Sequence, residues 1–230
     1  MNCGACGLQG CEAYAEMVAR GELGPDLCVP GGDAVAKAVG RIMGVEVKEK
    51  VKMRAVVLCQ GGREECGMRF DYDGEPDCRA AAATMGGPKK CPSGCLGFGT
   101  CAQVCPFGAI TMSENRLPVI DKDLCTACGL CVRTCPRGII KLIPADCHVW
   151  VACSTPARGK GVKATCSRGC ISCQICVKKD PKQAIRMENN LPVLDYEAGS
   201  DFLEAAEKCP QNCFVVENVA EPAGAGQATA

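Results

Sequence analysis

The chain has 230 residues, a length that allows one or two domains. Its 23 cysteines outnumber its one Trp, three Tyr and five Phe together, so several small modules built on inorganic clusters are expected in place of one large hydrophobic core. Lys plus Arg and Asp plus Glu both number 26, which excludes the basic footprint of a nucleic-acid-binding protein. No apolar run approaches the roughly eighteen residues of a membrane helix. Without a signal peptide the thiols should stay reduced, so a disulfide framework is not expected.

Four cysteines open the chain in the spacing C-x2-C-x4-C-x16-C, with glycines between the first three. Glycine there lets backbone amides approach a cluster and donate hydrogen bonds to its sulfurs. Tyr14, Met17 and Val18 recur at helical spacing, so a helix should bring the fourth cysteine back to the others. We therefore predict a helical [4Fe-4S] domain over residues 1–32, with a structural zinc site as the alternative. Its expected ligands are Cys3, Cys6, Cys11 and Cys28.

Residues 33–52 have the pattern of an amphipathic helix followed by a charged connector. A strand at 56–58 should follow, and then an irregular, glycine-rich insertion that leads to a short alanine helix at 79–85. Three cysteines of this region have two interpretations, as ligands of a further cluster or as reduced structural thiols, and their spacing does not decide between them. The candidate further ligands are Cys59, Cys66 and Cys78, together with Cys91.

Residues 91–136 organise the rest of the chain. They contain C-x3-C-x5-C-x3-C-P and, twenty residues on, C-x2-C-x2-C-x3-C-P. The second run is typical of bacterial ferredoxins, in which three thiolates hold one cluster and the fourth reaches to another. Zinc sites are usually closed tetrahedra of two cysteine pairs, which favours iron and sulfide here. By the crossing rule one cluster should use Cys105, Cys125, Cys128 and Cys131, and the other Cys95, Cys101 and Cys135 with Cys91. If Cys91 serves a further cluster instead, this second site must find its fourth ligand elsewhere.

The chain also repeats itself. The pattern around Cys91 recurs seventy-five residues later around Cys166, and the string RLPVID returns as NLPVLD. We therefore predict a second ferredoxin-like unit. The copies differ at one informative position, because the second has Cys173 where the first has Phe98. Only the second copy thus has a full C-x2-C-x2-C triplet in this place.

The second copy has lost the ligands of one cluster. Asp180 stands in the place of Cys105, and DYEAGSDFLEA replaces DKDLCTACGLC. The surviving cluster should use Cys170, Cys173, Cys176 and Cys209. Four cysteines then remain without a role: Cys147, Cys153, Cys166 and Cys213. Cys153 matches Cys59 and Cys166 matches Cys91, which gives each copy an extra thiol pair.

Several long strings resemble one family. NCGACGLQGCEAYAEMVARGE and LCVPGG are similar to the small cluster domain of RnfB, the B-type subunit of the Rnf electron-transport complex. RAVVLCQGG, DCRAAAATMGGPKKCPSGCLGFGTCAQVCPFGAI and DLCTACGLCVRTCPRGII resemble the longer form of RnfB in anaerobic bacteria, and the resemblance covers about residues 2–215. The loss of one cluster from the second copy departs from the usual RnfB pattern.

The resemblance implies a function and a location. The Rnf complex moves electrons between reduced ferredoxin and NAD while it pumps ions, and RnfB is its ferredoxin-side polyferredoxin. Expected partners are therefore ferredoxin and the other subunits, at the cytoplasmic face of the inner membrane. The family usually anchors RnfB through an N-terminal membrane helix. Here Met1 precedes the first motif by one residue, so the expectation is that the anchor was removed or that this relative lacks it, and that other contact with the membrane comes through partner subunits.

The predicted fold class is α+β, in small cluster-dominated modules. These are the N-terminal domain 1–32, a helical connector 33–52, two tandem ferredoxin-like units at 53–145 and 146–217, and a disordered tail at 218–230. At least four [4Fe-4S] clusters, with a fifth as an option, and no nucleotide fingerprint such as G-x-G-x-x-G predict electron transfer without a catalytic site. A small acidic ferredoxin should dock at a basic pair such as Lys89-Lys90 or Lys178-Lys179. The alternatives are a free-standing polyferredoxin serving a soluble anaerobic oxidoreductase and a zinc-stabilised interaction module.

Overall fold

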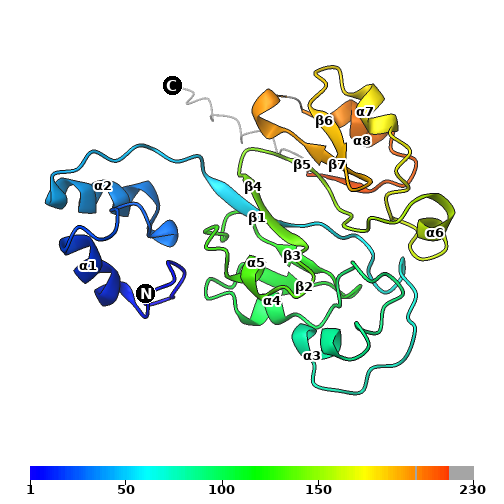
Figure 1. The fold of residues 1–230 in the computed structure, drawn as a ribbon, viewed down its shortest axis with the longest axis horizontal. Coiled ribbons are helices and arrows are strands. Elements are labelled where there is room, and N and C mark those ends of the chain that lie inside the picture. Colours follow the sequence, from blue (N-terminus) through cyan, green and yellow to red (C-terminus); the bar gives the residue numbers. More distant parts are fainter. Residues whose placement is uncertain (200, 218–230) are drawn as a thin grey trace, which may run out of the picture.

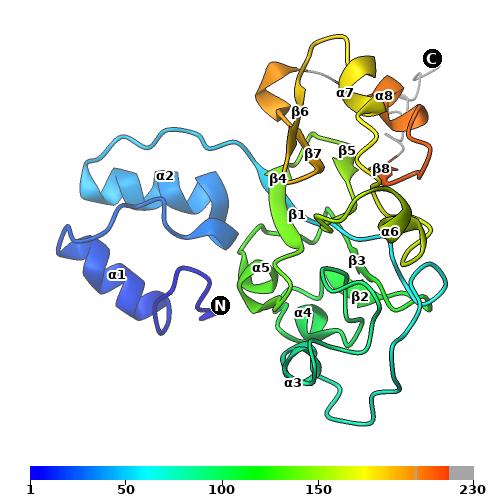
Figure 2. The same ribbon diagram turned by 45° about the vertical axis from the view of Figure 1, so that its right-hand side comes forward.

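The computed structural model describes residues 1–199 and 201–217, so the predicted tail at 218–230 lies outside the described residues. Two N-terminal helices, α1 (Cys11–Ala19) and α2 (Gly32–Met43), stand to one side of the rest of the chain, and a turn of 3-10 helix, η1 (Val29–Gly31), joins them (Figure 1 and Figure 2). The start of α1 is fixed by Asn2, whose side-chain oxygen accepts a hydrogen bond from the Cys11 backbone N–H at 2.9 Å. The predicted helix in this region is therefore present.

The first ferredoxin-like unit is built on two antiparallel strand pairs. Its first and last strands, β1 (Met53–Val57) and β4 (Ile140–Pro144), pair with each other, and β2 (Ile110–Met112) and β3 (Pro118–Ile120) form a hairpin between them. Three short helices complete it: α3 (Cys78–Ala83), α4 (Thr100–Gln103) and α5 (Leu130–Thr134). All residues of β1 after Met53 are buried, which explains its continuous apolar character.

The second unit repeats this order of elements. Its first and last strands, β5 (Val149–Val151) and β8 (Phe214–Val216), pair antiparallel around a hairpin of β6 (Ile185–Glu188) and β7 (Leu191–Leu194). The helical elements are α6 (Gly159–Lys163), α7 (Ile175–Lys179), η2 (Tyr196–Ala198) and α8 (Leu203–Glu207). α7 follows its cysteine triplet as α4 follows the cysteines of the first unit, and α8 takes the position of α5. The repeat in the sequence is thus a repeat in the structure.

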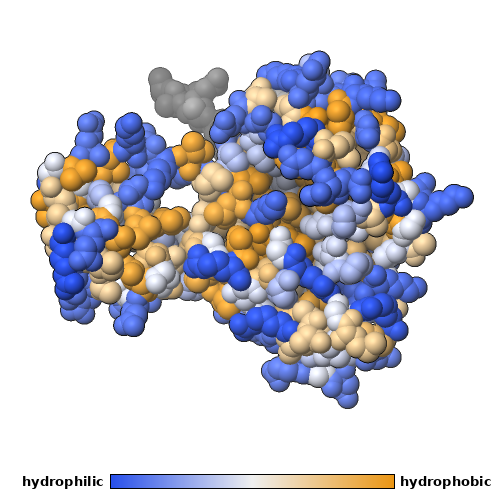
Figure 3. Space-filling view, viewed as in Figure 1, coloured by the Kyte–Doolittle hydropathy of each residue, from blue (hydrophilic) through white to orange (hydrophobic). Residues whose placement is uncertain are grey.

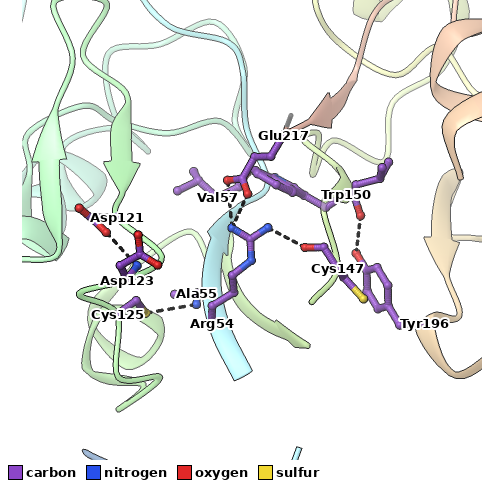
Figure 4. Close-up of polar contacts among 11 residues, drawn as sticks. Arg54, Ala55, Val57, Asp121, Asp123, Cys125, Cys147, Trp150, Tyr196 and Glu217 are labelled. Carbon is purple, nitrogen blue, oxygen red and sulfur yellow. Dashed lines mark hydrogen bonds and ion pairs between the residues drawn. The ribbon is translucent and has the colours of Figure 1, made fainter. Parts of the chain in front are cut away.

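Arg54 ties the two units together (Figure 4). Its side chain, on β1, is 3% exposed, and its Nη1 lies 2.8 Å from Oε2 of Glu217, just after β8. Its Nη2 donates to the Cys147 carbonyl at 2.6 Å, and the guanidinium lies 5.2 Å from the centre of the Trp150 ring. The Trp150 indole in turn donates to the Val57 carbonyl at 3.2 Å. These buried contacts hold β1 of the first unit against β5 and β8 of the second.

The apolar cores of the units are small and contain cysteines, as the composition predicted. The core of the second unit joins Cys170, Cys176 and Cys209 to residues such as Ile185 and Phe214. Mixed short helices and strands agree with the predicted α+β class. Within residues 1–199 and 201–217, none of the helices has the length and apolar character that crossing a membrane requires.

Candidate metal centres

Two thiol-lined cavities lie in the first unit. Site I is lined by Cys78, Cys95, Cys101 and Cys135. Site II is lined by Cys105, Cys125, Cys128 and Cys131. The thiols that come from α4 and α5 and the residues just after them are divided between the two cavities. The structure therefore places Cys105 with the C-x2-C-x2-C run and sends Cys135 to the other cavity, which is the crossing expected from the ferredoxin spacing.

Site II has the backbone surroundings of a cluster site. The N–H of Ala55 on β1 donates to Sγ of Cys125 at 3.4 Å (Figure 4). The loop between the cysteines needs left-handed backbone at Ala127 and Gly129, with φ of 55° and 75°. Such a loop turns the chain around a central object, and an N–H bond to a ligand sulfur is one way in which proteins tune cluster potentials.

Site I differs from the prediction in its fourth thiol. Cys91 was expected there, but the structure does not bring it to this cavity and places Cys78 there instead. The sequence carried a signal for this arrangement. Phe98 occupies the position of Cys173, so the first unit lacks one thiol of its triplet, and a cysteine from elsewhere has to complete the set.

A buried hydrogen-bond network positions Cys78 at the start of α3. The carboxylate of Asp77 caps this helix by accepting from the backbone N–H groups of Arg79 and Ala80 at 2.7 and 3.1 Å. The hydroxyl of Thr100, which is 2% exposed on α4, accepts from the Cys78 N–H at 2.7 Å and donates to Asp77 at 3.0 Å. This network fastens α3 to α4 and keeps the Cys78 thiol beside site I.

The second unit holds one such cavity, site III. It is lined by the predicted Cys170, Cys173, Cys176 and Cys209, and also by Cys213. Cys213 follows Cys209 by four residues, just as the core residue Ile139 follows Cys135, and both are fully buried. Its Sγ lies 3.4 Å from Sγ of Cys209. Cys213 therefore occupies a packing position of the repeat behind the cavity.

The cluster lost from the second unit is replaced by packing and backbone contacts. Asp180, in the place of Cys105, is 4% exposed, and its carboxylate accepts from the backbone N–H groups of Ile185, at 2.9 Å, and of Ala184. Phe202, in the place of Cys128, is also 4% exposed and belongs to the core of the unit. An aromatic ring and a capped turn thus fill the volume that site II occupies in the first unit.

The N-terminal cysteines are arranged more openly. Cys3, Cys11 and Cys28 line a cavity between α1 and α2, and Cys6 does not line it. The remaining lining is apolar, and Figure 3 shows apolar side chains at the surface over these helices. Gly31 lies close to the ligand set, because a Cβ on it would be 3.1 Å from Sγ of Cys28. Three of the four predicted ligands are thus together on one cavity.

A further cavity lies between the two units. Its thiols are those of Cys59, Cys66, Cys91, Cys153 and Cys166, and we call it the junction cavity. Three of these belonged to the candidate set of a further cluster, and Cys78 leaves that set for site I. Lys89 lies near this cavity and is 2% exposed, with its ammonium bonded to the Gly61 carbonyl. The prediction that Lys89-Lys90 forms a surface pair is therefore wrong for Lys89.

The thiols of sites I to III suit soft metal ions. Burial raises the pKa of Cys95 and Cys131 to about 12 and that of Cys101 and Cys176 to about 11. Such thiols ionise when a metal replaces the proton, and thiolate sets of this kind select iron–sulfur clusters, copper(I) or zinc. In the described part of the chain, no three or more His, Cys, Asp or Glu side chains are arranged to hold a metal ion. The thiols stand instead around empty volumes of about 390, 330 and 340 Å³ in sites I, II and III, open solvent included.

Two parts of the chain match family models. Residues 1–30 match the model described as "Putative Fe-S cluster", which spans the N-terminal cysteines. Residues 118–141 match "4Fe-4S binding domain", which spans the C-x2-C-x2-C-x3-C-P run. Iron–sulfur binding is thus supported both by the cavities and by these matches.

The chain is also similar to longer curated proteins, each the B-type subunit of a named complex. It is 45% identical over 213 residues, 93% of its own length and 64% of the relative's, to that of the Na(+)-translocating ferredoxin:NAD(+) oxidoreductase complex of Acetobacterium woodii. It is 41% identical, over 93% of its length and 81% of the relative's, to that of the ion-translocating oxidoreductase complex of Methanosarcina acetivorans. It is 44% identical, over 90% and 74% respectively, to that of the proton-translocating ferredoxin:NAD(+) oxidoreductase complex of Clostridium ljungdahlii.

Proposed function

The chain belongs to the RnfB family, the B-type subunits of ion-translocating oxidoreductase complexes, and from this premise we propose that it is a multi-cluster electron-transfer subunit that connects low-potential ferredoxin to the other subunits of such a complex. The observation that carries the proposal is the crossed pair of cavities, because two clusters that share α4 and α5 are held close together in one rigid unit. Each cluster would accept or give one electron at a time, which is the chemistry that ferredoxin supplies.

The proposal assigns four clusters to four sets of thiols. Site I would be held by Cys78, Cys95, Cys101 and Cys135, site II by Cys105, Cys125, Cys128 and Cys131, site III by Cys170, Cys173, Cys176 and Cys209, and the N-terminal cluster by Cys3, Cys6, Cys11 and Cys28. Cys91, predicted from the spacing as a site I ligand, is replaced by Cys78 in this assignment. The set of each site reaches four thiolates without sharing a cysteine.

Contacts between the modules support a continuous path. Cys101 of site I and Cys131 of site II belong to one buried core. On the other side of α5, the guanidinium of Arg133 donates to the carbonyl of Ala5, between Cys3 and Cys6, at 3.4 Å. The N-terminal loop therefore rests on the helix that contributes to site II. Electrons could pass between the N-terminal cluster and the crossed pair at this contact.

Site III is the best candidate for exchange with ferredoxin. Cys173 is exposed, so the cavity comes to the surface of the molecule. Lys178 and Lys179 lie on α7 a few residues further on, and both are exposed. Cations beside an exposed cluster attract an acidic ferredoxin and raise its association rate. This places the docking pair predicted from the sequence beside a redox centre.

Reduced low-potential ferredoxin should bleach the visible band of the anaerobically reconstituted chain near about 400 nm, where iron–sulfur proteins absorb. The bleaching rate should fall as salt is added, because screening weakens the attraction between exposed charges. NADH alone should leave the band unchanged, since a two-electron hydride donor needs a flavin to deliver single electrons. Stopped-flow absorbance measures both reactions.

Two charge-reversal variants make this test specific. Lys178→Glu with Lys179→Glu should slow reduction several-fold at low ionic strength and much less in high salt. The control, Lys48→Glu with Lys52→Glu, makes the same change of charge in the connector, away from the thiol cavities, and should keep the original rate. Rapid bleaching by NADH without a flavoprotein, or no bleaching by any low-potential ferredoxin, would contradict the proposed function.

A further inference from the structure

We propose that the junction cavity holds a fifth [4Fe-4S] cluster, ligated jointly by the two units through Cys59 and Cys91 of the first and Cys153 and Cys166 of the second. The inference rests on the proposed function, because its consequence is a continuous electron path between the units. All four thiols line one cavity, and its empty volume of about 340 Å³ matches those of sites II and III, at about 330 and 340 Å³.

One pair of these thiols follows corresponding strands. Cys59 stands two residues after β1, and Cys153 stands two residues after β5. The backbone N–H of Cys95 donates to Sγ of Cys59 at 3.4 Å, and the N–H of Cys170 donates to Sγ of Cys153 at 3.3 Å. The two sulfurs thus have the same backbone partner in each copy, and the bond is of the type made to Cys125 in site II.

The other pair stands on corresponding turns. Cys91 precedes Cys95 by four residues, and Cys166 precedes Cys170 by four. Each turn is closed by a glycine N–H, from Gly94 to the Cys91 carbonyl at 3.3 Å and from Gly169 to the Cys166 carbonyl at 3.4 Å. The junction cavity is therefore where two equivalent thiol pairs, one from each copy of the repeat, face each other.

Cys66 is the fifth thiol of the cavity and has no counterpart in the second copy. It is 1% exposed and pairs with Cys166 through an isolated antiparallel β-bridge. Its thiol makes a hydrogen bond with the thiol of Cys166. A cube needs four thiolates, so we assign Cys66 to the support of Cys166 and the four repeat-related thiols to the iron atoms.

The charges around the cavity suit an anionic guest. Lys89 is 2% exposed, and among the described residues no carboxylate forms an ion pair with it. A buried ammonium without a counter-charge is costly, and a carbonyl oxygen such as that of Gly61 offsets only part of this cost. Arg168 also lines the cavity. A cluster with four thiolates carries net negative charge and would supply the missing counter-charge.

The backbone approaches the thiols closely at Gly61. A Cβ on this residue would lie 3.0 Å from Sγ of Cys166 and 3.8 Å from Sγ of Cys59. The first distance is shorter than ordinary van der Waals contact, so a side chain here would displace a sulfur of the second unit. Glycine lets a loop of the first unit close over a thiol of the second, as expected for a shared site.

The junction cluster would join sites I and III. Cys59 is one hydrogen bond from Cys95 of site I, and Cys153 is one hydrogen bond from Cys170 of site III. An electron that ferredoxin delivers to site III would leave that cluster, which is oxidised, and enter the junction cluster, which is reduced. The same electron would then reduce site I and return the junction cluster to its oxidised state. No proton or further reactant is required.

Iron counting on the full chain, reconstituted anaerobically with iron and sulfide, tests the site. Cys59→Ala with Cys153→Ala leaves three thiols around the cavity, whichever four bind, so it should lose about four irons per chain. The low-temperature EPR spectrum of the dithionite-reduced variant should lose one cluster component. Cys147→Ala, which removes a thiol that lines none of these cavities, should change neither measurement. Cys66→Ala should keep all the irons, whereas loss of about four irons from it would overturn the ligand assignment.

A parallel variant separates this inference from the proposed function. Cys125→Ala should lose about four irons from site II. If it does so while the Cys59→Ala, Cys153→Ala chain keeps all its iron and its full EPR spectrum, the junction cluster is overturned and the proposed function stands. If both variants lose about four irons each, the junction site is supported. Ferredoxin should then still reduce site III of the double variant rapidly but the remaining clusters slowly, which splits a single bleaching phase into two.

Discussion

Cys105→Ala should remove about four irons from the reconstituted chain, and the further change Cys128→Ala should remove no more. Both thiols line site II, so either change destroys the same cluster. Cys105→Ala combined with Cys101→Ala should instead remove about eight irons, although Cys101 is nearer in the sequence, because Cys101 lines site I. Changes within one cluster are thus non-additive and changes in two clusters are additive, which iron counting measures directly.

The second half of the crossing has its own pair of variants. Cys135→Ala with Cys95→Ala should cost about four irons, and Cys135→Ala with Cys131→Ala about eight. An uncrossed arrangement would give the reverse result, because Cys131 and Cys135 would then share a cluster. Cys147→Ala again serves as the control, since its thiol lies outside the cavities. A loss of only about four irons in the Cys131, Cys135 pair would contradict the ferredoxin interpretation of this unit.

Cys78→Ala should remove the cluster of site I, although Cys78 lies outside both cysteine runs. The informative background is the chain that carries Cys59→Ala and Cys153→Ala, in which the junction cavity can hold no four-ligand cluster. There, adding Cys78→Ala should remove about four further irons. Adding Cys91→Ala should remove none, because Cys91 lines the junction cavity and not site I. Anaerobic iron and acid-labile sulfide assays measure both.

The Cys91 arm decides between sequence spacing and structure. If Cys91 were the fourth ligand of site I, as its place at the start of the first run suggests, its removal from that background would cost about four irons and the removal of Cys78 none. Thr100→Val offers a milder check on the geometry, because it removes the hydroxyl that bonds the Cys78 N–H and Asp77. It should weaken iron retention at site I under a chelator while leaving the initial iron content unchanged.

Spacing within a short segment was informative about the sites. The ferredoxin run predicted that Cys105 and Cys135 exchange partners, and the structure places both thiols accordingly. The repeat predicted a second unit, and the same strand order is present there. The departure at Asp180 also signalled a lost cluster, because a carboxylate cannot replace a thiolate in such a set. These inferences succeed because nearby ligands on one loop have little freedom to go elsewhere.

Contacts between distant segments could not be predicted in this way. Cys78 reaches site I because Asp77 and Thr100 fasten α3 to α4, and neither residue belongs to a recognisable motif. The junction cavity depends on how Arg54 and Trp150 set the two units against each other. The sequence showed that Cys153 matches Cys59, but only the packing of the units shows that the two pairs face one cavity.

Iron and acid-labile sulfide content per chain, after anaerobic reconstitution and removal of loosely bound metal, tests the central claim most directly. The account predicts about twenty irons and about twenty sulfides, from four clusters in the N-terminal site and sites I to III and a fifth at the junction. The claim that this chain is a multi-cluster electron-transfer subunit would be contradicted by fewer than about twelve irons in fully loaded protein, or by bound zinc without sulfide.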